Sequence, residues 1–295
     1  MIKTTPMTDT LTLISRFAQQ SLVAEVSLAP KPGLVDPFSA GAHDDMDYDL
    51  FMTSIQAWSP FLKLYLKLGQ ASPDLAHLFA SLRRAGSQGE RMMLLATHQV
   101  NTHKGANFSY AVLLGALGWC LKTQTLATLQ AEHFQSVFTA VQTMTAGITA
   151  ADFKHVSIKD HLSYGEELYV RYGVTGIRGE AEAGYPALQQ LALPWLRLHT
   201  DLPVTERYLK LMLYLMAELE DVNLLHRGGQ AGLAKVQTAA RELQVADLSG
   251  TTLVKALRDL DQQLIDWHLS PGGTADLLAL GIFFDQLQVS PLTLI

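Results

Sequence analysis

The chain has 295 residues, of which 48% are hydrophobic and 17% charged, and its formal net charge is −6. This composition supplies enough apolar material for a large core and excludes an intrinsically disordered chain, since disordered sequences are poor in hydrophobic residues. The negative charge argues against a protein that binds nucleic acid through the phosphate backbone. The single cysteine, Cys120, excludes an internal disulfide and fits a reducing compartment.

The sequence shows no targeting or membrane segment. The first ten residues lack the apolar core of a signal peptide. The most apolar run, Ala111–Leu121, is too short to cross a bilayer. We therefore expect a soluble, cytoplasmic protein.

Apolar residues recur at helical spacing along most of the chain, and no segment alternates as a β-strand would. No flexible linker or charge run divides the sequence. The pattern therefore predicts an all-α protein of about a dozen helices that forms a single domain over residues 1–295. In chain order, the expected helices are 10–28, 47–68 with a break at Pro60, 72–85, 90–98, 106–122, 125–148, 166–172, 188–199, 205–225, 232–243, 251–269 and 275–286.

Five polar, glycine-rich breaks interrupt these helices, and they hold most of the notable histidine, lysine, arginine and acidic residues. The first break is stiffened by three prolines, which rule out a regular helix there. Binding and catalytic residues concentrate on loops of this kind. We therefore expect these helix ends to converge on one cleft. The breaks are 30–47, 101–105, 163–186, 220–229 and 270–276.

Several residues in the breaks have the chemistry of phosphate binding. A lysine and a histidine stand at a helix start, and glycines followed by threonine open the last helix; both patterns suit an anion at a helix N-terminus. Arginines offer bidentate phosphate contacts. The alternatives are an exposed lysine, a threonine helix cap and arginine–glutamate pairs. The candidates are His103, Lys104, Arg178, Arg227, Gly272, Gly273 and Thr274.

Acidic residues outnumber cations in these breaks, and they include Asp44, Asp45, Asp47, Glu180, Glu182, Glu220 and Asp221. Carboxylates beside phosphates are typical of Mg²⁺ held by one or two acids and the substrate. Glu25 lies on the same helical face as Ile14, so it faces inward as a ligand-contacting group or a satisfied core acid. The sequence contains no zinc spacing, Walker A loop, dinucleotide glycine motif or nucleophile elbow.

Six segments, taken in order, resemble the triphosphoribosyl-dephospho-coenzyme A synthase family, which makes the prosthetic-group precursor of citrate lyase and malonate decarboxylase. Two residues depart from the family pattern: Val222 stands where threonine is more frequent, and Asn107 where an apolar residue is more frequent. The matching segments are Glu25–Asp36, Ser39–Asp47, Asn101–Gly105, Tyr164–Pro186, Asp221–Gly229 and Ser270–Ala279.

The resemblance implies a transferase that uses ATP, as Mg-ATP, and 3′-dephospho-coenzyme A. The triphosphoribosyl group of ATP moves to the 2′-hydroxyl of the acceptor, and adenine leaves. The bond that breaks is the N-glycosidic bond, so the triphosphate serves as an anchor, in keeping with the missing Walker loop. The product would pass to a carrier-protein holo-synthase, and a homodimer is compatible with the family.

Displacement at a ribosyl carbon needs carboxylates near an oxocarbenium-like transition state, an acid for adenine and a base for the hydroxyl. Two other readings stay open: a hydrolase of nucleotide N-glycosidic bonds, and a non-catalytic helical module that binds nucleotide or a carrier protein. We assign Lys31, Lys104, Arg178 and the start of the last helix to phosphates; Asp44, Asp47, Glu180 and Asp221 to Mg²⁺; and Glu25, Asp36, His43 and Glu182 to catalysis.

Overall fold

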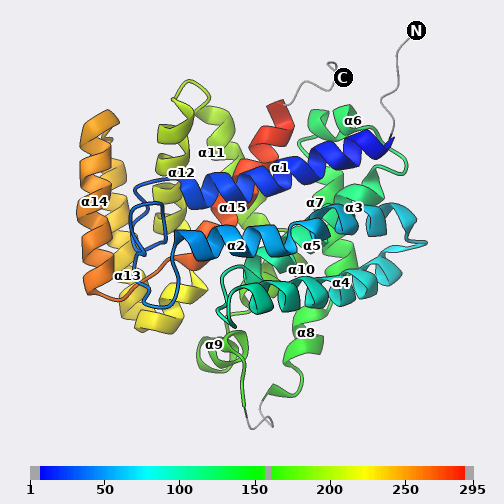
Figure 1. Cartoon of the computed structure of the whole chain (residues 1–295), viewed down its shortest axis with the longest axis horizontal. Helices are drawn as coiled ribbons and strands as arrows, with labels where there is room; N and C mark the ends of the chain where they lie inside the picture. The colour runs from blue at the N-terminus through cyan, green and yellow to red at the C-terminus, as the bar shows by residue number, and fades with distance from the viewer. Residues whose placement is uncertain (1–6, 157–160, 290–295) are drawn as a thin grey trace.

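The computed structural model describes residues 7–156 and 161–289, which form helices α1–α15 and one π-helical segment, η2 (Figure 1). The described residues contain no β-strand, so the all-α prediction is confirmed. None of their helices is both long and apolar enough to span a membrane. The elements are α1 (Met7–Ser27), α2 (Tyr48–Trp58), α3 (Pro60–Ala71), α4 (Leu75–Ala96), α5 (Lys104–Cys120), α6 (Leu126–Ala131), α7 (Gln135–Thr145), α8 (Ile148–Phe153), α9 (Tyr164–Tyr172), α10 (Gly176–Glu182), η2 (Ala187–Ala192), α11 (Leu193–Leu198), α12 (Val204–Glu218), α13 (Val222–Val245), α14 (Gly250–Asp266) and α15 (Gly272–Val289).

Helices α5 and α15 form the centre of the molecule because their residues are apolar on almost every face. Helix α5 packs against α3, α4, α7 and α15, whereas α15 packs against α1, α12, α13 and η2. At Gly118 a Cβ atom would lie 2.1 Å from the Leu66 carbonyl oxygen, so α3 and α5 approach backbone to backbone. The Tyr110 hydroxyl of α5 donates to the Ala279 carbonyl of α15 at 3.1 Å.

Helix α4 runs unbroken through Gly86 and Gly89, so the expected break between residues 85 and 90 is wrong. Gly89 lies in a packed interface, where a Cβ atom would come within 3.0 Å of the Tyr65 hydroxyl. The same interface explains Asn107, since its side chain accepts from the Tyr65 hydroxyl at 2.6 Å and donates to the Gly86 carbonyl at 2.9 Å. The unusual asparagine therefore joins α3, α4 and α5.

Other elements also differ from the sequence-based expectation, which lacks α8 and α10. The helix expected over 125–148 is divided into α6 and α7 at Phe134, whose φ of 61° is left-handed. The helix expected over 205–225 ends at Glu218, and α13 begins at Val222. Within α13 the backbone is kinked at Gly229, whose φ of 61° and ψ of −164° are not helical, in keeping with the helix end expected just before this glycine. The separate start of α13 matters for function, because it lies beside the start of α15.

Candidate active site

A cleft of about 1130 Å³ opens where the helix ends meet, and all five polar breaks contribute residues to its lining. The expected convergence on one cleft is therefore confirmed. The starts of α5, α13 and α15 and the last turn of α1 all reach it. Three helix N-termini thus point their partial positive charges toward the same space.

A buried ion pair lies at the floor of the cleft. Lys31 Nζ donates to Glu25 Oε1, and the side chains are 2% and 7% exposed. Burial raises the pKa of Glu25, and the charge and hydrogen bond of Lys31 oppose this rise. The inward orientation expected for Glu25 is confirmed. Lys31 lines the cleft, but its ammonium group is paired with the carboxylate of Glu25.

Asp276, near the start of α15, also lines the cleft, and it is not among the site residues expected from the sequence. Its carboxylate lies against Gly105, where a Cβ atom would come within 2.2 Å of Asp276 Oδ2. Burial, and then the charges of Glu25 and Asp221, raise the pKa of Asp276 to about 8. In the sequence, Asp276 falls in the first turn of the helix expected over 275–286, where an aspartate is explained by its favourable interaction with the helix dipole.

Asp221 ties the starts of α13 and α15 together. Its Oδ1 accepts from the backbone N–H groups of Asn223 at 2.9 Å and Leu224 at 3.3 Å. Its Oδ2 accepts from the backbone N–H and hydroxyl of Thr274 at 2.7 Å and 3.0 Å. Burial raises the pKa of Asp221, and these hydrogen bonds oppose the rise.

These contacts argue against two expected roles, that of Asp221 as a metal ligand and that of Thr274 in phosphate binding. Both oxygens of Asp221 are occupied by protein donors, so a metal would have to displace them. Thr274 is fully buried, and its N–H is directed at Asp221 rather than at a phosphate. Gly272 and Gly273 do line the cleft, but their lack of side chains has a packing reason: Cβ atoms there would lie 2.7 Å from Asn223 Nδ2 and 3.2 Å from the Asp221 carboxylate.

His43 and Arg227 connect the first break to the fourth and last breaks. Arg227 Nη1 donates to the Ala42 carbonyl at 2.7 Å, and Nη2 lies 3.1 Å from His43 Nδ1. A guanidinium can only donate, so Nδ1 accepts, and His43 Nε2–H donates to Ser270 Oγ at 2.9 Å. Burial and then Arg227 lower the pKa of His43, against a smaller opposite effect of Asp45. His43 is therefore a neutral residue that lines the cleft.

His103 and Lys104 lie side by side in sequence but differ in charge and exposure. His103 is buried, and its Nδ1 is 2.8 Å from Ser54 Oγ. Burial and then Lys31 lower its pKa to about 3, so it is neutral and does not attract phosphate as a cation. Lys104 is 57% exposed and pairs with Glu90 at 2.7 Å. Both residues line the cleft.

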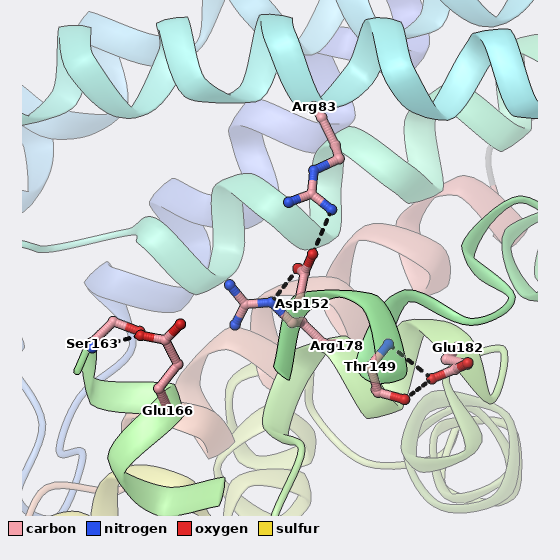
Figure 2. A network of polar contacts seen from close by, with 7 residues as sticks. All are labelled: Arg83, Thr149, Asp152, Ser163, Glu166, Arg178 and Glu182. Carbon is pink, nitrogen blue, oxygen red and sulfur yellow. Dashed lines mark hydrogen bonds and ion pairs between the residues drawn. The ribbon is translucent and has the colours of Figure 1, made fainter. Parts of the chain in front are cut away.

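Two arginines share one carboxylate on the cleft wall (Figure 2). Arg83 of α4 donates to Asp152 Oδ1 at 2.9 Å, and Arg178 of α10 donates from Nε to Asp152 Oδ2 at 2.8 Å. Burial raises the pKa of Asp152, but the two arginines outweigh it and the net shift is downward. The triad carries a net positive charge. The sequence did not indicate Arg83 or Asp152 as site residues because both lie outside the five breaks.

Besides Thr274, four predicted site residues are not part of the cleft lining: Asp36, Asp44, Asp47 and Glu182. Asp36 shapes the first break, since it accepts from the backbone N–H groups of Lys31, Phe38 and Ser39 at 3.1, 2.8 and 3.0 Å. Asp44 is exposed. Asp47 caps α2 by accepting from Leu50 N–H at 2.9 Å.

Glu182 lies beside Thr149 and apart from the group formed by Arg83, Asp152 and Arg178 (Figure 2). Its carboxylate accepts from the Thr149 hydroxyl and from the backbone N–H groups of Gly147 and Thr149 at the start of α8. The hydrogen bond from the Thr149 hydroxyl is the main reason why the pKa of Glu182 is lowered. Asp36, Asp47 and Glu182 thus hold backbone, and their positions argue against the catalytic and metal roles expected from the sequence.

We expect Glu182→Gln to leave turnover within a few-fold of wild type and to lower the free energy of unfolding by about 1 kcal/mol, the usual scale of a lost helix cap. The physical reason is that only the contacts at the start of α8 change. Steady-state kinetics and urea unfolding would check both quantities. A large loss of turnover with unchanged stability would return Glu182 to the catalytic set.

The expected magnesium ligands do not form a metal site on their own. Among residues 7–156 and 161–289, no group of three or more histidine, cysteine, aspartate or glutamate side chains is arranged to hold a metal ion. Of the four expected ligands, Glu180 both lines the cleft and has a lightly used carboxylate, which accepts from Ala187 N–H at 3.2 Å. Burial raises the pKa of Glu180, and this hydrogen bond opposes the rise.

The fold and site define an all-helical protein in which helix ends enclose one large cleft with carboxylates at its floor and arginines on its wall. The family model for CitG, ATP:dephospho-CoA triphosphoribosyl transferase, matches residues 12–292, and the chain belongs to this family of transferases.

Curated relatives agree with this assignment. A Streptococcus equi subsp. zooepidemicus protein named "Probable 2-(5''-triphosphoribosyl)-3'-dephosphocoenzyme-A synthase" is 45% identical, over 93% of this chain and 96% of that protein. A Streptococcus mutans protein of the same name is 42% identical, over 95% and 98% of the two chains. A crystal structure from Archaeoglobus fulgidus, of a "putative triphosphoribosyl-dephospho-coA synthase", has 16% identity and a TM-score of 0.46, covering 81% of this chain and 99% of that chain.

Proposed function

We propose that the cleft binds ATP and 3′-dephospho-coenzyme A together and transfers the triphosphoribosyl group of ATP to the acceptor's 2′-hydroxyl. Adenine leaves, and 2′-(5″-triphosphoribosyl)-3′-dephospho-coenzyme A forms. One observation supports this proposal above all: the six segments that resemble the family all line one cleft. Buried carboxylates lie at the floor of this cleft, and two arginines lie on its wall. Carboxylates suit a ribosyl cation, and arginines suit phosphates.

The size of the cleft supports two substrates. Its volume of about 1130 Å³ lies above the range of about 300–1,000 Å³ that is usual for a pocket with one small ligand. Transfer between two nucleotides requires both to be present at once, with the acceptor hydroxyl close to the ribosyl carbon. A hydrolase would need room only for one nucleotide and a water molecule.

The phosphates are best placed on the wall formed by Arg83 and Arg178, with Lys104 at the start of α5 as a further contact. The two arginines share Asp152, so one positive charge is left over for an anion. Helix α5 begins with Lys104, and its N-cap residue, His103, makes no side-chain hydrogen bond to the helix. An anion there is favoured by the helix dipole as well as by the lysine.

The net charge of the cleft supports Mg-ATP, rather than free ATP, as the substrate. Among the described lining residues, eight are aspartate or glutamate and five are lysine or arginine. With the histidines neutral, their net charge is −3 when all carboxylates are ionised and −2 when Asp276 is protonated. A polyphosphate would be repelled unless a cation accompanies it. Mg²⁺ bound by the phosphates needs one or two protein carboxylates at most. Glu180 fits this role, and the ion would neutralise phosphate charge.

We expect the double variant Arg83→Ala, Arg178→Ala to bind Mg-ATP about 100-fold or more weakly, because each lost charge-assisted hydrogen bond is worth about 1.5–3 kcal/mol. Isothermal titration calorimetry would measure the dissociation constant. Arg258→Ala is the matched control, since Arg258 is exposed on α14 and lies outside the cleft lining. ATP affinity equal to wild type in a folded double variant would place the phosphates elsewhere.

The proposed function is tested by incubating the purified chain with Mg-ATP and 3′-dephospho-coenzyme A and following free adenine by chromatography. We expect adenine and the triphosphoribosyl product in equal amounts, and no adenine without the acceptor. Adenine formed from ATP alone would show the hydrolase instead. ATP binding with no adenine under any of these conditions would show a non-catalytic module. The product would then be handed to a carrier-protein holo-synthase that serves citrate lyase or malonate decarboxylase.

A further inference from the structure

Most carboxylates in the cleft already have partners. Glu25 is paired with Lys31, Asp152 with two arginines, and Asp221 with donors from α13 and α15. In the part of the chain that the structure describes, two carboxylates of the lining have no hydrogen-bond or ion-pair partner: Glu220, which is exposed, and Asp276, which is desolvated by burial. A polar group placed in this way is available to a substrate.

We propose that Asp276 is the general acid that protonates the departing adenine; this inference rests on the proposed function. Asp276 lines the cleft near the start of α15, and Asp221 fixes this start through its hydrogen bonds from Thr274. Gly105 leaves the space that the carboxyl group occupies, since any side chain at that position would collide with it. The Asp276 carboxyl group is thus positioned by packing, and its oxygen atoms make no hydrogen bonds to described residues.

The surroundings of Asp276 keep it protonated near neutral pH. Burial is the largest cause of its raised pKa, followed by the negative charges of Glu25 on α1 and Asp221 at the start of α13. Lys31 faces the same region but is paired with Glu25. Tyr110 of α5 and Tyr185 before η2 also interact electrostatically with Asp276. Burial raises the pKa of both tyrosines, so neither is ionised.

The bond between the ribosyl C1′ and adenine N9 breaks, and its electron pair moves into the adenine ring, which takes the proton of Asp276 at a ring nitrogen. A bond forms between C1′ and the 2′-oxygen of 3′-dephospho-coenzyme A. The proton of that hydroxyl is released and, through solvent, returns Asp276 to its acid form. Adenine leaves neutral, and no oxidant or further reactant is needed.

Asp276→Asn keeps the shape of the side chain but cannot donate this proton. We expect kcat with ATP to fall by about 100-fold or more, the usual range for general acid catalysis. We also expect wild-type kcat/KM to fall as pH rises through about 8, where Asp276 loses its proton, and this decline to vanish in the variant. Asp259→Asn, exposed on α14, is the matched control and should behave as wild type.

The sharper test uses 7-methyl-ATP, whose base is already positively charged and leaves neutral without a proton. We expect Asp276→Asn to be within about ten-fold of wild type on this substrate. An equal loss with both nucleotides, a loss below about ten-fold with ATP, or recovery by excess Mg²⁺ would each overturn the proposal. If wild type itself released no adenine, the proposed function would fail instead.

Gly105→Ala gives a second variant in case Asp276→Asn does not fold. The new methyl group would push the Asp276 carboxyl group out of its position while leaving its chemistry intact. We expect the same selective loss with ATP and near-normal use of 7-methyl-ATP. Thermal unfolding at pH 9 supplies a structural readout: Asp276→Asn should be at least as stable as wild type there, because it removes a charge that burial disfavours.

Discussion

Replacing Lys31 by methionine is expected to lower the free energy of unfolding by about 3–5 kcal/mol, since it leaves the buried carboxylate of Glu25 without its cation. Urea unfolding at pH 7 would measure the loss. The sign with pH follows from Glu25, whose folded pKa is raised by burial. The unfolded state gives up this proton at lower pH, so the defect should grow as pH rises above the ordinary glutamate value and shrink toward acid.

The double variant Glu25→Gln, Lys31→Met is the control, because it removes both charges together. We expect it to recover most of the lost stability, as replacing a whole buried pair by neutral groups is often well tolerated. The two single variants and the double complete a mutant cycle for the pair. If Lys31→Met kept full stability but bound ATP far more weakly, Lys31 would be the phosphate anchor that the sequence suggested.

Substitutions of Asp221 distinguish a role in capping helices from a role as a metal ligand. Asp221→Ala is expected to cost about 2–4 kcal/mol, because four donors at the starts of α13 and α15 lose their acceptor. Asp221→Asn should cost about 1–2 kcal/mol, since asparagine caps a helix well but has a single acceptor oxygen. Chemical unfolding and adenine release would be measured on both variants.

The relation between the two measurements decides the role of Asp221. We expect turnover to fall in parallel with stability, as α15 carries Asp276 into the cleft. A ligand of Mg²⁺ would behave differently: Asp221→Asn would then keep its stability, lose turnover, and require more Mg²⁺ for half-maximal rate. That outcome would restore the metal role expected from the sequence.

Helical periodicity alone predicted the fold class, and it also located the five breaks whose residues line the cleft. The same periodicity gave wrong helix boundaries where packing between helices, rather than the local sequence, determines the structure. Gly89 predicts a helix break but lies against Tyr65 inside α4. The single helix expected over 205–225 is in fact two helices, α12 and α13. Glycine and proline rules act on the local backbone, whereas these positions are decided by packing between helices.

The same division holds for the site. The sequence by itself determined which chemistry is present: acids and cations at helix ends, an inward Glu25, and the family's ordered segments. Only the tertiary structure decided which of these groups are already satisfied, because a carboxylate's partners come from distant parts of the chain. Asp36, Asp47, Asp221 and Glu182 cap or tie backbone, while Asp276 is left without a partner, and its protonation is set by neighbours that no local pattern reveals.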